Sequence, residues 1–370
     1  MKSLYGKSIT NKAKLWLILP LVVILVAVAV FTGYAVSYKD ISKGMNIGVD
    51  FAGGTVITVT LGETALSGDG YNTHLQNVVD AVTSKEIAEK VAAYAQEKGK
   101  NLNADAAVGS ISYSQRSGSG ETQAIVVKCD NISSTYDTET NEITQYRNQL
   151  IEEQLRTIYT DEAGYNQDTV TTQFISATAS SALIRTALLA IFITLVLILI
   201  YIIFRFEIWS GIAAIIGLMH DVIMMVALTT IFHIQINSAF IAAMITIVAY
   251  SINNTIVVFD RMRENIKRDQ GLSNGAIHNV NAVVDRSIWE TLLRSVNSTL
   301  TTMVAIVLFA ILGASSVREF ALPVIFGLIA GFYSSLCVAP SLYCLMKNAY
   351  INRKSKSGQT KKSKQIAGLN

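Results

Sequence analysis

The stretch ITIVAYSINNTIVVFDRMREN, from Ile245 to Asn265, is an apolar run interrupted by polar residues and followed by charges. Its apolar part is typical of the end of a membrane span, yet the adjacent amides Asn253 and Asn254 precede the last apolar turn. An unpaired amide is costly in hydrocarbon, because no water is there to hydrogen-bond it. The stretch therefore predicts a membrane helix whose amides contact polar partners inside a bundle.

The whole chain has the composition of a membrane protein. Of its 370 residues 51% are apolar and 15% are charged, against about 25% charged in soluble domains. Several apolar stretches approach the roughly 20 residues that a helix needs to cross a bilayer. They are residues 15–36, 182–204, 211–232, 239–259, 299–317 and 322–346. The sequence predicts an α-helical integral membrane protein with six transmembrane helices, the last five forming a bundle over 182–346.

Positive charge is concentrated in three segments, 1–14, 260–297 and 347–370. The short loops after the third and fifth spans together hold a single cation, Arg318. By the positive-inside rule, both termini and the 260–297 connection are expected to be cytoplasmic. The polar stretch 37–181 between the first two spans then forms an extracytoplasmic domain. We expect the basic tail, 347–370, to lack regular structure and to lie near anionic lipid.

Within the outer domain, segments that alternate like strands are interspersed with segments of helical periodicity. The expected strands are 55–61, 109–114, 124–129 and 169–175, and the expected helices are 78–100 and 141–160. The order β-α-β-β-α-β is typical of an α+β ferredoxin-like domain. This fold hosts many functions, so it does not define an activity.

The motif GVDFAGGT, from Gly48 to Thr55, directly precedes the first of these strands. Glycines such as Gly53 and Gly54 permit a positive φ or a close backbone approach. A tight turn into the strand is one interpretation. A phosphate-binding loop is the other, but no Lys-Ser/Thr pair follows the glycines and we expect no helix to start there.

Asp221 lies near the middle of the third span, directly after His220. An acidic residue at that depth is rare and points to a functional role. It predicts either an ion relay or a structural hydrogen bond between helices, and the sequence favours neither. In the fourth span Ser251 and Asn254 recur at helical spacing, with Asn253 alongside, which predicts a polar strip.

The fifth and sixth spans offer matching small and polar residues. The fifth carries Ser298 and Thr302, with Arg294 about one turn before Ser298. A guanidinium inside a bundle needs an acceptor, and the amide oxygens of Asn253 and Asn254 are candidates. The sixth span carries Gly327 and Gly331, a small-xxx-small pattern that predicts close helix packing.

Several stretches resemble one family when they are taken together and in order. They are GVDFAGGT (48–55), FRFEIW (204–209), HDV (220–222), YSINNTIVVFDRMREN (250–265), TLLRSVNSTLTT (291–302) and GFYSSLCVA (331–339). Over nearly the whole chain they resemble the SecD/SecF family of membrane subunits that accompany the Sec translocase. The positions that match its motifs outside the polar strips are Gly48, Asp50, Phe51, Gly53, Gly54, Asp260 and Arg261.

The resemblance implies that the chain is the smaller, six-span half of a pseudosymmetric unit related to the RND transporters, in the bacterial cytoplasmic membrane. The implied partners are a SecD subunit, the SecYEG translocon, the translocating preprotein, a YidC-type insertase and membrane lipid. The family uses the proton- or sodium-motive force to move outer domains that contact the emerging preprotein. No nucleic acid, cofactor or catalytic residue is implied.

One position departs from the family pattern. The fourth span of the family usually carries an aspartate, treated as a proton carrier, where this chain has Asn254. An amide does not titrate, whereas the arginine of the family is matched by Arg294. The hypothesis is that Asn253, Asn254 and Arg294 line the contact with SecD. The ion-carrying carboxylate then comes from SecD, and Asp221 supplements it.

Two other functions fit the sequence less well. An RND-type exporter of lipids or small molecules normally carries both six-span halves, and this chain has one. A membrane-bound enzyme needs a nucleophile with a base or a metal, but no His-x-x-x-His, Gly-x-Ser-x-Gly or paired intramembrane aspartates occur. The four histidines are scattered, and Cys129 is the only cysteine of the outer domain, so no metal site is expected.

Overall fold

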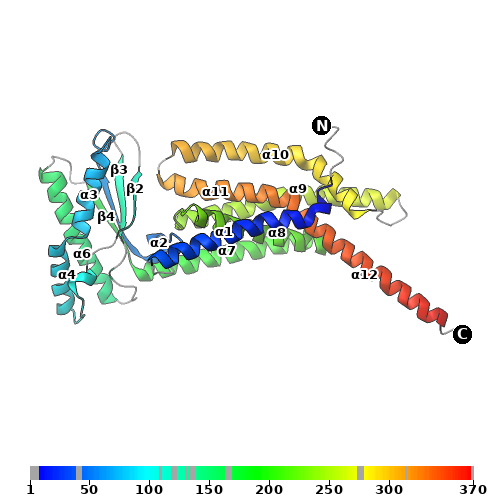
Figure 1. Ribbon diagram of the computed structural model, residues 1–370, viewed down its shortest axis with the longest axis horizontal. Coiled ribbons are helices and arrows are strands. Elements are labelled where there is room, and N and C mark those ends of the chain that lie inside the picture. Colours follow the sequence, from blue (N-terminus) through cyan, green and yellow to red (C-terminus); the bar gives the residue numbers. More distant parts are fainter. Residues whose placement is uncertain are drawn as a thin grey trace.

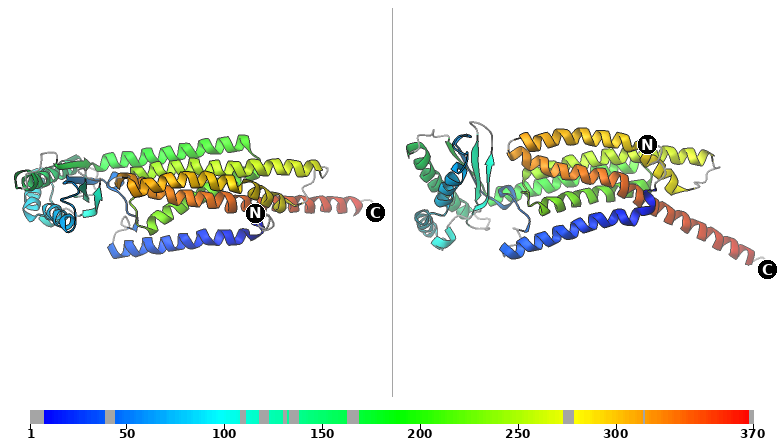
Figure 2. Two further views of the ribbon diagram at one scale, coloured as in Figure 1. Left: turned by 90° about the horizontal axis from the view of Figure 1, so that it is seen from above. Right: turned by 45° about the horizontal axis from the view of Figure 1, so that its top comes forward.

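The computed structural model describes residues 8–38, 44–107, 111–117, 123–129, 132, 138–162, 169–272, 279–313 and 315–367. Figure 1 shows an elongated molecule, with an α+β domain at one end and a bundle of long helices along the rest. The start of α1 (Ala13–Tyr38) and the end of α12 (Ala339–Ala367) lie at the side of the bundle away from the sheet. The last helix projects beyond the bundle, as both views of Figure 2 also show.

Within the described residues, six helical segments are long and apolar enough to cross a membrane. They are α1 (Ala13–Tyr38), α7 (Ala177–Arg205), α8 (Ile208–Ile231), α9 (Ser238–Leu272), α10 (Val280–Leu312) and α11 (Ser315–Tyr333), which runs on through a π-helical turn, η6 (Ser334–Val338), into α12 (Ala339–Ala367). Each contains most of one apolar stretch, because lipid-exposed backbone must satisfy its own hydrogen bonds.

Several helix ends differ from the predicted ones. The 260–297 connection is mostly helical, since α9 continues to Leu272 and α10 starts at Val280. The fifth span was predicted to end at 317, but α10 ends at Leu312. There Gly313 adopts an extended conformation, and a Cβ would lie 2.3 Å from the carbonyl oxygen of Phe309. The tail was predicted to lack regular structure, but α12 is helical to Ala367. Its sequence has no proline after Pro340 and many helix-forming lysines.

The bundle has an inner and an outer set of helices. In the most apolar part of α8, of α9 and of the segment that starts with α11, half or more of the residues are buried. The corresponding parts of α1, α7 and α10 are mostly exposed. The exposed side chains of the outer set are chiefly Leu, Ile, Val and Phe. Such a surface is stable against lipid or against another apolar protein. The inner helices therefore hold the protected positions of the bundle.

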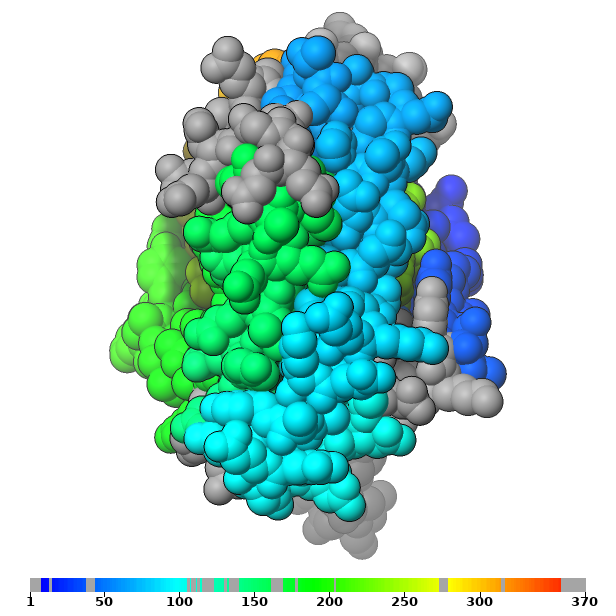
Figure 3. Space-filling view, turned by 90° about the vertical axis from the view of Figure 1, so that its left-hand side faces the viewer, coloured from blue at the N-terminus to red at the C-terminus, as the bar shows by residue number. Residues whose placement is uncertain are grey.

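The outer domain is built on a four-stranded antiparallel sheet in the order β2-β3-β1-β4. The strands are β1 (Gly54–Thr60), β2 (Ile111–Ser117), β3 (Ala124–Cys129) and β4 (Val170–Ile175). The longer helices are α3 (Gly70–Val82), α4 (Lys85–Glu97) and α6 (Thr138–Arg156). Figure 3 shows these helices forming the face turned away from the bundle, and their apolar sides share one core with the sheet.

One helix prediction in this domain was wrong. The stretch 78–100 was expected to be a single helix, but it belongs to two, α3 and α4. The helix is interrupted at Ser84. This residue has an extended backbone, and its Oγ accepts a hydrogen bond from the backbone N–H of Ile87. A serine in this role satisfies a free amide at a helix start, so it favours a new helix over continuation of the old one.

Candidate functional site in the helix bundle

A buried carboxylate lies where three inner helices meet. Asp221 on α8 is 1% exposed. Its Oδ2 accepts hydrogen bonds from Ser251 on α9 and from Ser334 at the start of η6, the latter at 2.8 Å. Its Oδ1 lies 2.9 Å from Nδ1 of His220. These four residues are called the Asp221 cluster below.

Small residues bring the helices of the cluster together. A Cβ on Gly331 would lie 3.0 Å from Cβ of Ser251, and one on Gly327 would lie 2.5 Å from the side chain of Ile247. These glycines let α11 approach α9 closely, as the small-xxx-small pattern predicts. Ser334 comes directly after the last residue of α11 and begins the π-helical turn η6. Such turns are often found at functional sites.

His220 links the carboxylate to the first helix. Its ring stacks on Tyr333 with centroids 6.1 Å apart, and the Tyr333 hydroxyl donates to the carbonyl of Trp16 on α1 at 2.6 Å. Among the described residues, His220 is the only basic side chain that pairs with Asp221. The carboxylate is therefore held by hydroxyls and one imidazole, without a permanently charged partner.

The two asparagines of the fourth span lie on different faces of α9. Asn254 is 2% exposed, and its Nδ2 donates to Oγ1 of Thr299 on α10 at 3.3 Å. Asn253 is exposed on the outside of the bundle. Successive residues of a helix point about 100° apart, which places the neighbours on different faces. The buried amide contacts a hydroxyl of the fifth span, so Asn254 lies inside this chain and not on the surface where a contact with SecD was hypothesised.

Arg294 does not lie in this interior. Its side chain is exposed on α10, and it forms no hydrogen bond or ion pair with any described residue, so the expected bond to Asn253 or Asn254 is not formed. Ser298 and Thr302 serve their own helix: Thr302 Oγ1 donates to the carbonyl of Ser298 at 3.2 Å. That same carbonyl accepts from the Tyr250 hydroxyl at 2.8 Å.

The GVDFAGGT motif ties the outer domain to the bundle. Contrary to expectation, a short helix, α2 (Val49–Ala52), starts within it. The Gly48 amide donates to the carbonyl of Ile236 in the α8–α9 loop at 2.8 Å. Oδ2 of Asp50 accepts from the first amide of α9, Ser238, at 3.0 Å. A carboxylate at a helix start is favourable for the free amides and the helix dipole there.

The two adjacent glycines of the motif, Gly53 and Gly54, are required by the backbone conformation, each for its own reason. Gly53 ends α2 with φ 74°, and Gly54 has φ 153°. A Cβ on Gly54 would lie 2.4 Å from the carbonyl oxygen of Cys129 on β3. Both properties expected of the pair, positive φ and close backbone approach, are present. Phe51 packs on the apolar cluster of the inner helices, so the motif touches both parts of the molecule.

A second polar group at this junction was missed from the sequence. Lys128 on β3 is 7% exposed. Its Nζ lies 3.5 Å from Oε1 of Glu319 on α11 and also donates to Gln235. Asn237 donates to the other oxygen of Glu319. These residues are called the junction cluster. The one available signal was a lysine within the apolar strand AIVVKC.

At the other end of the bundle, the remaining motif residues form ion pairs. Asp260 pairs with Arg205 at 2.9 Å. Glu290 on α10 accepts from Arg261 at 2.6 Å, from Asn265 at 2.8 Å and from Arg286 at 2.9 Å. This Glu290 cluster, consisting of Glu290, Arg261, Arg286 and Asn265, joins α9 to α10.

These features define a polytopic membrane protein with a buried carboxylate among its inner helices and an α+β domain bonded to the same bundle. The sequence profile of "Protein export membrane protein SecD/SecF, C-terminal" matches residues 154–349, and that of the "SecD/SecF GG Motif" matches 41–65. The chain belongs to the SecD/SecF family, with SecF proteins among its relatives.

Individual relatives agree with this assignment. The protein translocase subunit SecF of Sebaldella termitidis is 30% identical over 88% of this chain and 90% of its own length. SecDF of Bacillus subtilis is 35% identical over 54% of this chain but only 26% of its own. A crystal structure of SecDF from Thermus thermophilus matches 93% of this chain and 39% of its own, with a TM-score of 0.61 and 27% identity. The chain thus spans well under half of each SecDF protein.

Proposed function

We propose that the chain is the SecF-type subunit of a complex that assists Sec-dependent export of preproteins across the bacterial cytoplasmic membrane, driven by a proton or sodium gradient. Membership of the SecD/SecF family supports the transport role and speaks against an enzyme. The observation that carries the ion-driven part is Asp221, a carboxylate held between inner helices by hydroxyls and one imidazole. A carboxylate can take up and release a proton, which Asn254 cannot.

The geometry supports a way to couple ion uptake to movement. A proton on Asp221 removes the charge that strengthens the hydrogen bonds from Ser251 and Ser334. The contact between α9 and η6 then weakens. Helix α11 carries Glu319 of the junction cluster near its start, and it ends where η6 and Ser334 begin. It therefore connects the outer domain with the Asp221 cluster. A shift of α11 would pull on Lys128 and on the sheet.

The orientation in the membrane is part of the proposal. Both termini and the basic segments 1–14, 260–297 and 347–370 are assigned to the cytoplasm and the outer domain to the opposite side. In support, the start of α1 and the end of α12 lie at the side of the bundle away from the sheet (Figure 1). The outer domain is proposed to be ferredoxin-like, supported by its antiparallel order β2-β3-β1-β4.

A SecD-type subunit is the proposed partner in the membrane. Arg294 and Asn253 are exposed on helices of membrane length, where lipid would leave both without hydrogen-bond partners. A second subunit that covers this strip removes that cost. The SecYEG translocon, the emerging preprotein and a YidC-type insertase complete the proposed assembly.

Export into inverted membrane vesicles tests the function, using the chain together with its SecD-type subunit. Asp221→Asn is expected to abolish the stimulation of export by an ion gradient. Asp260→Asn, which removes a carboxylate outside the Asp221 cluster, is expected to retain it. Normal stimulation in Asp221→Asn would refute the role of the cluster, and equal export after collapse of every gradient would refute the mechanism. Failure to co-purify with a second six-span subunit would favour a stand-alone exporter.

A further inference from the structure

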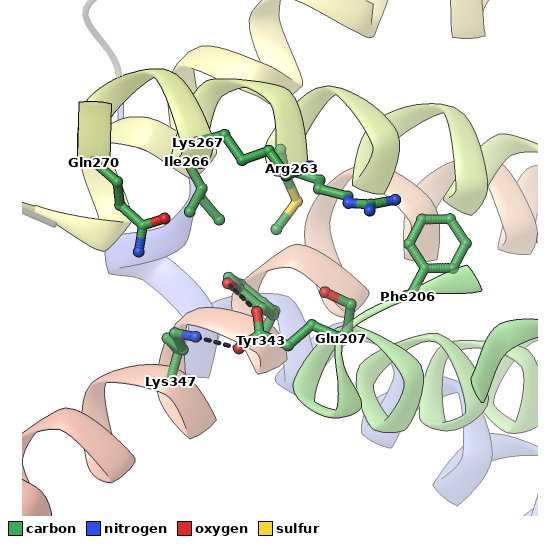
Figure 4. Close-up of a pocket in the computed structure, with 10 residues that line it drawn as sticks. Phe206, Glu207, Arg263, Ile266, Lys267, Gln270, Tyr343 and Lys347 are labelled. Carbon is green, nitrogen blue, oxygen red and sulfur yellow. Dashed lines mark hydrogen bonds and ion pairs between the residues drawn. The ribbon is translucent and has the colours of Figure 1, made fainter. Parts of the chain in front are cut away.

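A pocket opens at the end of the bundle that lies away from the outer domain. It has a volume of about 260 Å³ and is lined by the start of α8, the extension of α9 and the start of α12. Figure 4 shows Arg263 and Lys267 on α9 facing Glu207, Tyr343 and Lys347 across it. The residues of the Asp221 cluster and of the junction cluster do not line it.

The walls of the pocket are amphipathic. Phe206, Met262, Ile266 and Tyr343 form the apolar part of the lining, and Met262 and Tyr343 are buried. The charged part consists of Arg263, Lys267, Lys347 and Glu207. A ligand that fits both parts has an anionic group joined to an apolar one.

The charges of the pocket do not balance. Glu207 pairs with Lys347, which neutralises that cation. Arg263 and Lys267 are exposed, lie on one face of α9 at i and i+4, and have no carboxylate partner among the described residues. Arg263 donates only to the carbonyl of Arg205, at 3.4 Å. Two cations are thus available for an anion.

The position of the pocket indicates what carries that anion. Next to it, Phe204 at the end of α7 is 88% exposed and Ile208 at the start of α8 is 74% exposed, which is unfavourable in water. Trp209 and Tyr350 pair close by, with ring centroids 5.4 Å apart, and such aromatic residues mark the membrane–water boundary. The pocket therefore lies where hydrocarbon ends and phosphate headgroups begin.

We infer that this pocket binds the headgroup of an anionic phospholipid. Arg263 and Lys267 contact the phosphate, and the acyl chains lie against Phe204 and Ile208. Basic pockets between membrane helices are suited to such headgroups, and each cation near the surface contributes about 1 kcal/mol to binding. The inference rests on the geometry of this end of the bundle and is independent of the proposed function.

Native mass spectrometry of the full chain in detergent tests the site, with added phosphatidylglycerol, phosphatidylcholine or inorganic phosphate. The wild type is expected to retain phosphatidylglycerol in preference to phosphatidylcholine. The double variant Arg263→Gln/Lys267→Gln should weaken retention about five-fold for each cation removed. The matched control Arg268→Gln/Arg353→Gln removes equal charge from exposed positions outside the pocket and should keep the wild-type preference.

Three outcomes would overturn the inference. Equal retention of the two lipids would show that charge does not select the ligand. Unchanged retention by the pocket variant, or equal losses in the pocket and control variants, would show that Arg263 and Lys267 are not the binding groups. Displacement of the lipid by equimolar inorganic phosphate would assign the pocket to a free anion. Thermal melts of each variant establish that the fold is retained.

Discussion

Two carboxylates in the helix bundle are surrounded in opposite ways. Glu290 accepts hydrogen bonds from Arg261 and Arg286 as well as from Asn265, so cations with fixed charge compensate it. Asp221 is buried more deeply, yet its partners are Ser251, Ser334 and His220. A carboxylate between two guanidiniums is held as an anion, whereas one held by hydroxyls can still accept hydrogen bonds, although weaker ones, after it takes up a proton. The comparison separates a structural ion-pair network from a group suited to carry a proton.

Neutralising each carboxylate without changing its shape is expected to give the largest contrast. Glu290→Gln leaves Arg261 and Arg286 facing a neutral amide and should destabilise the protein by about 3 kcal/mol. Asp221→Asn keeps an oxygen for both serine hydroxyls and should cost about 1 kcal/mol or less. Thermal unfolding of the purified chain in detergent measures both variants. Equal losses would contradict the comparison.

Removing the hydroxyl donors tests whether Ser251 and Ser334 act as a pair. Both donate to Oδ2 of Asp221, so either one alone keeps that oxygen satisfied. The free energy of unfolding of the double variant Ser251→Ala/Ser334→Ala should fall by about 2 kcal/mol. This loss should exceed the sum of the losses in the two single variants by about 1 kcal/mol. Denaturant unfolding of the four proteins gives this coupling energy. Strict additivity would show that the two hydroxyls act independently. Ser341→Ala on α12 controls for loss of a buried serine hydroxyl elsewhere.

The junction cluster is a set of contacts between strand β3 of the outer domain and the helix bundle. Glu319→Gln weakens its contact with Lys128 and should destabilise the docking of β3 by about 1 kcal/mol. Hydrogen exchange is then expected to rise in β3, while protection around Asp221 on α8 stays unchanged. Glu264→Gln, at an exposed carboxylate of α9, serves as the control. Increased exchange in α8 alone would place the weak point inside the bundle.

The smallest expected effect is a dependence of stability on pH that arises in the outer domain. Burial lowers the pKa of His74 in the outer domain below its usual 6.5. The unfolded chain therefore binds a proton more readily there, and stability falls as the pH drops through about 6.5 towards the folded pKa. His74 is only partly buried and is a single group, so acidification should lower the unfolding midpoint by only about 1 °C. His74→Gln should remove this part of the pH dependence. An unchanged profile in that variant would assign the dependence to other groups.

The fold was predicted from the sequence more completely than the site was. The apolar stretches predicted six helices of membrane length, and four strands lie in 54–175 as expected, although the first predicted helix there is two helices, α3 and α4. Among the site residues, Asp221 and Ser251 were each singled out by the sequence, but no pattern in it indicated that they would meet. The expected bond between Arg294 and the asparagines failed, because spacing alone does not decide which face of a helix is covered.

The sequence by itself determined which segments are long and apolar enough to cross a membrane and which polar side chains lie within them, because hydrophobicity and periodicity are local properties. Only the tertiary structure decided which of them meet. Ser334 reaches Asp221 through close packing of glycines and a π-helical turn. Lys128, Gln235 and Glu319 come together although they are distant in sequence. Such contacts depend on how helices and sheet pack against one another, and no local pattern records that.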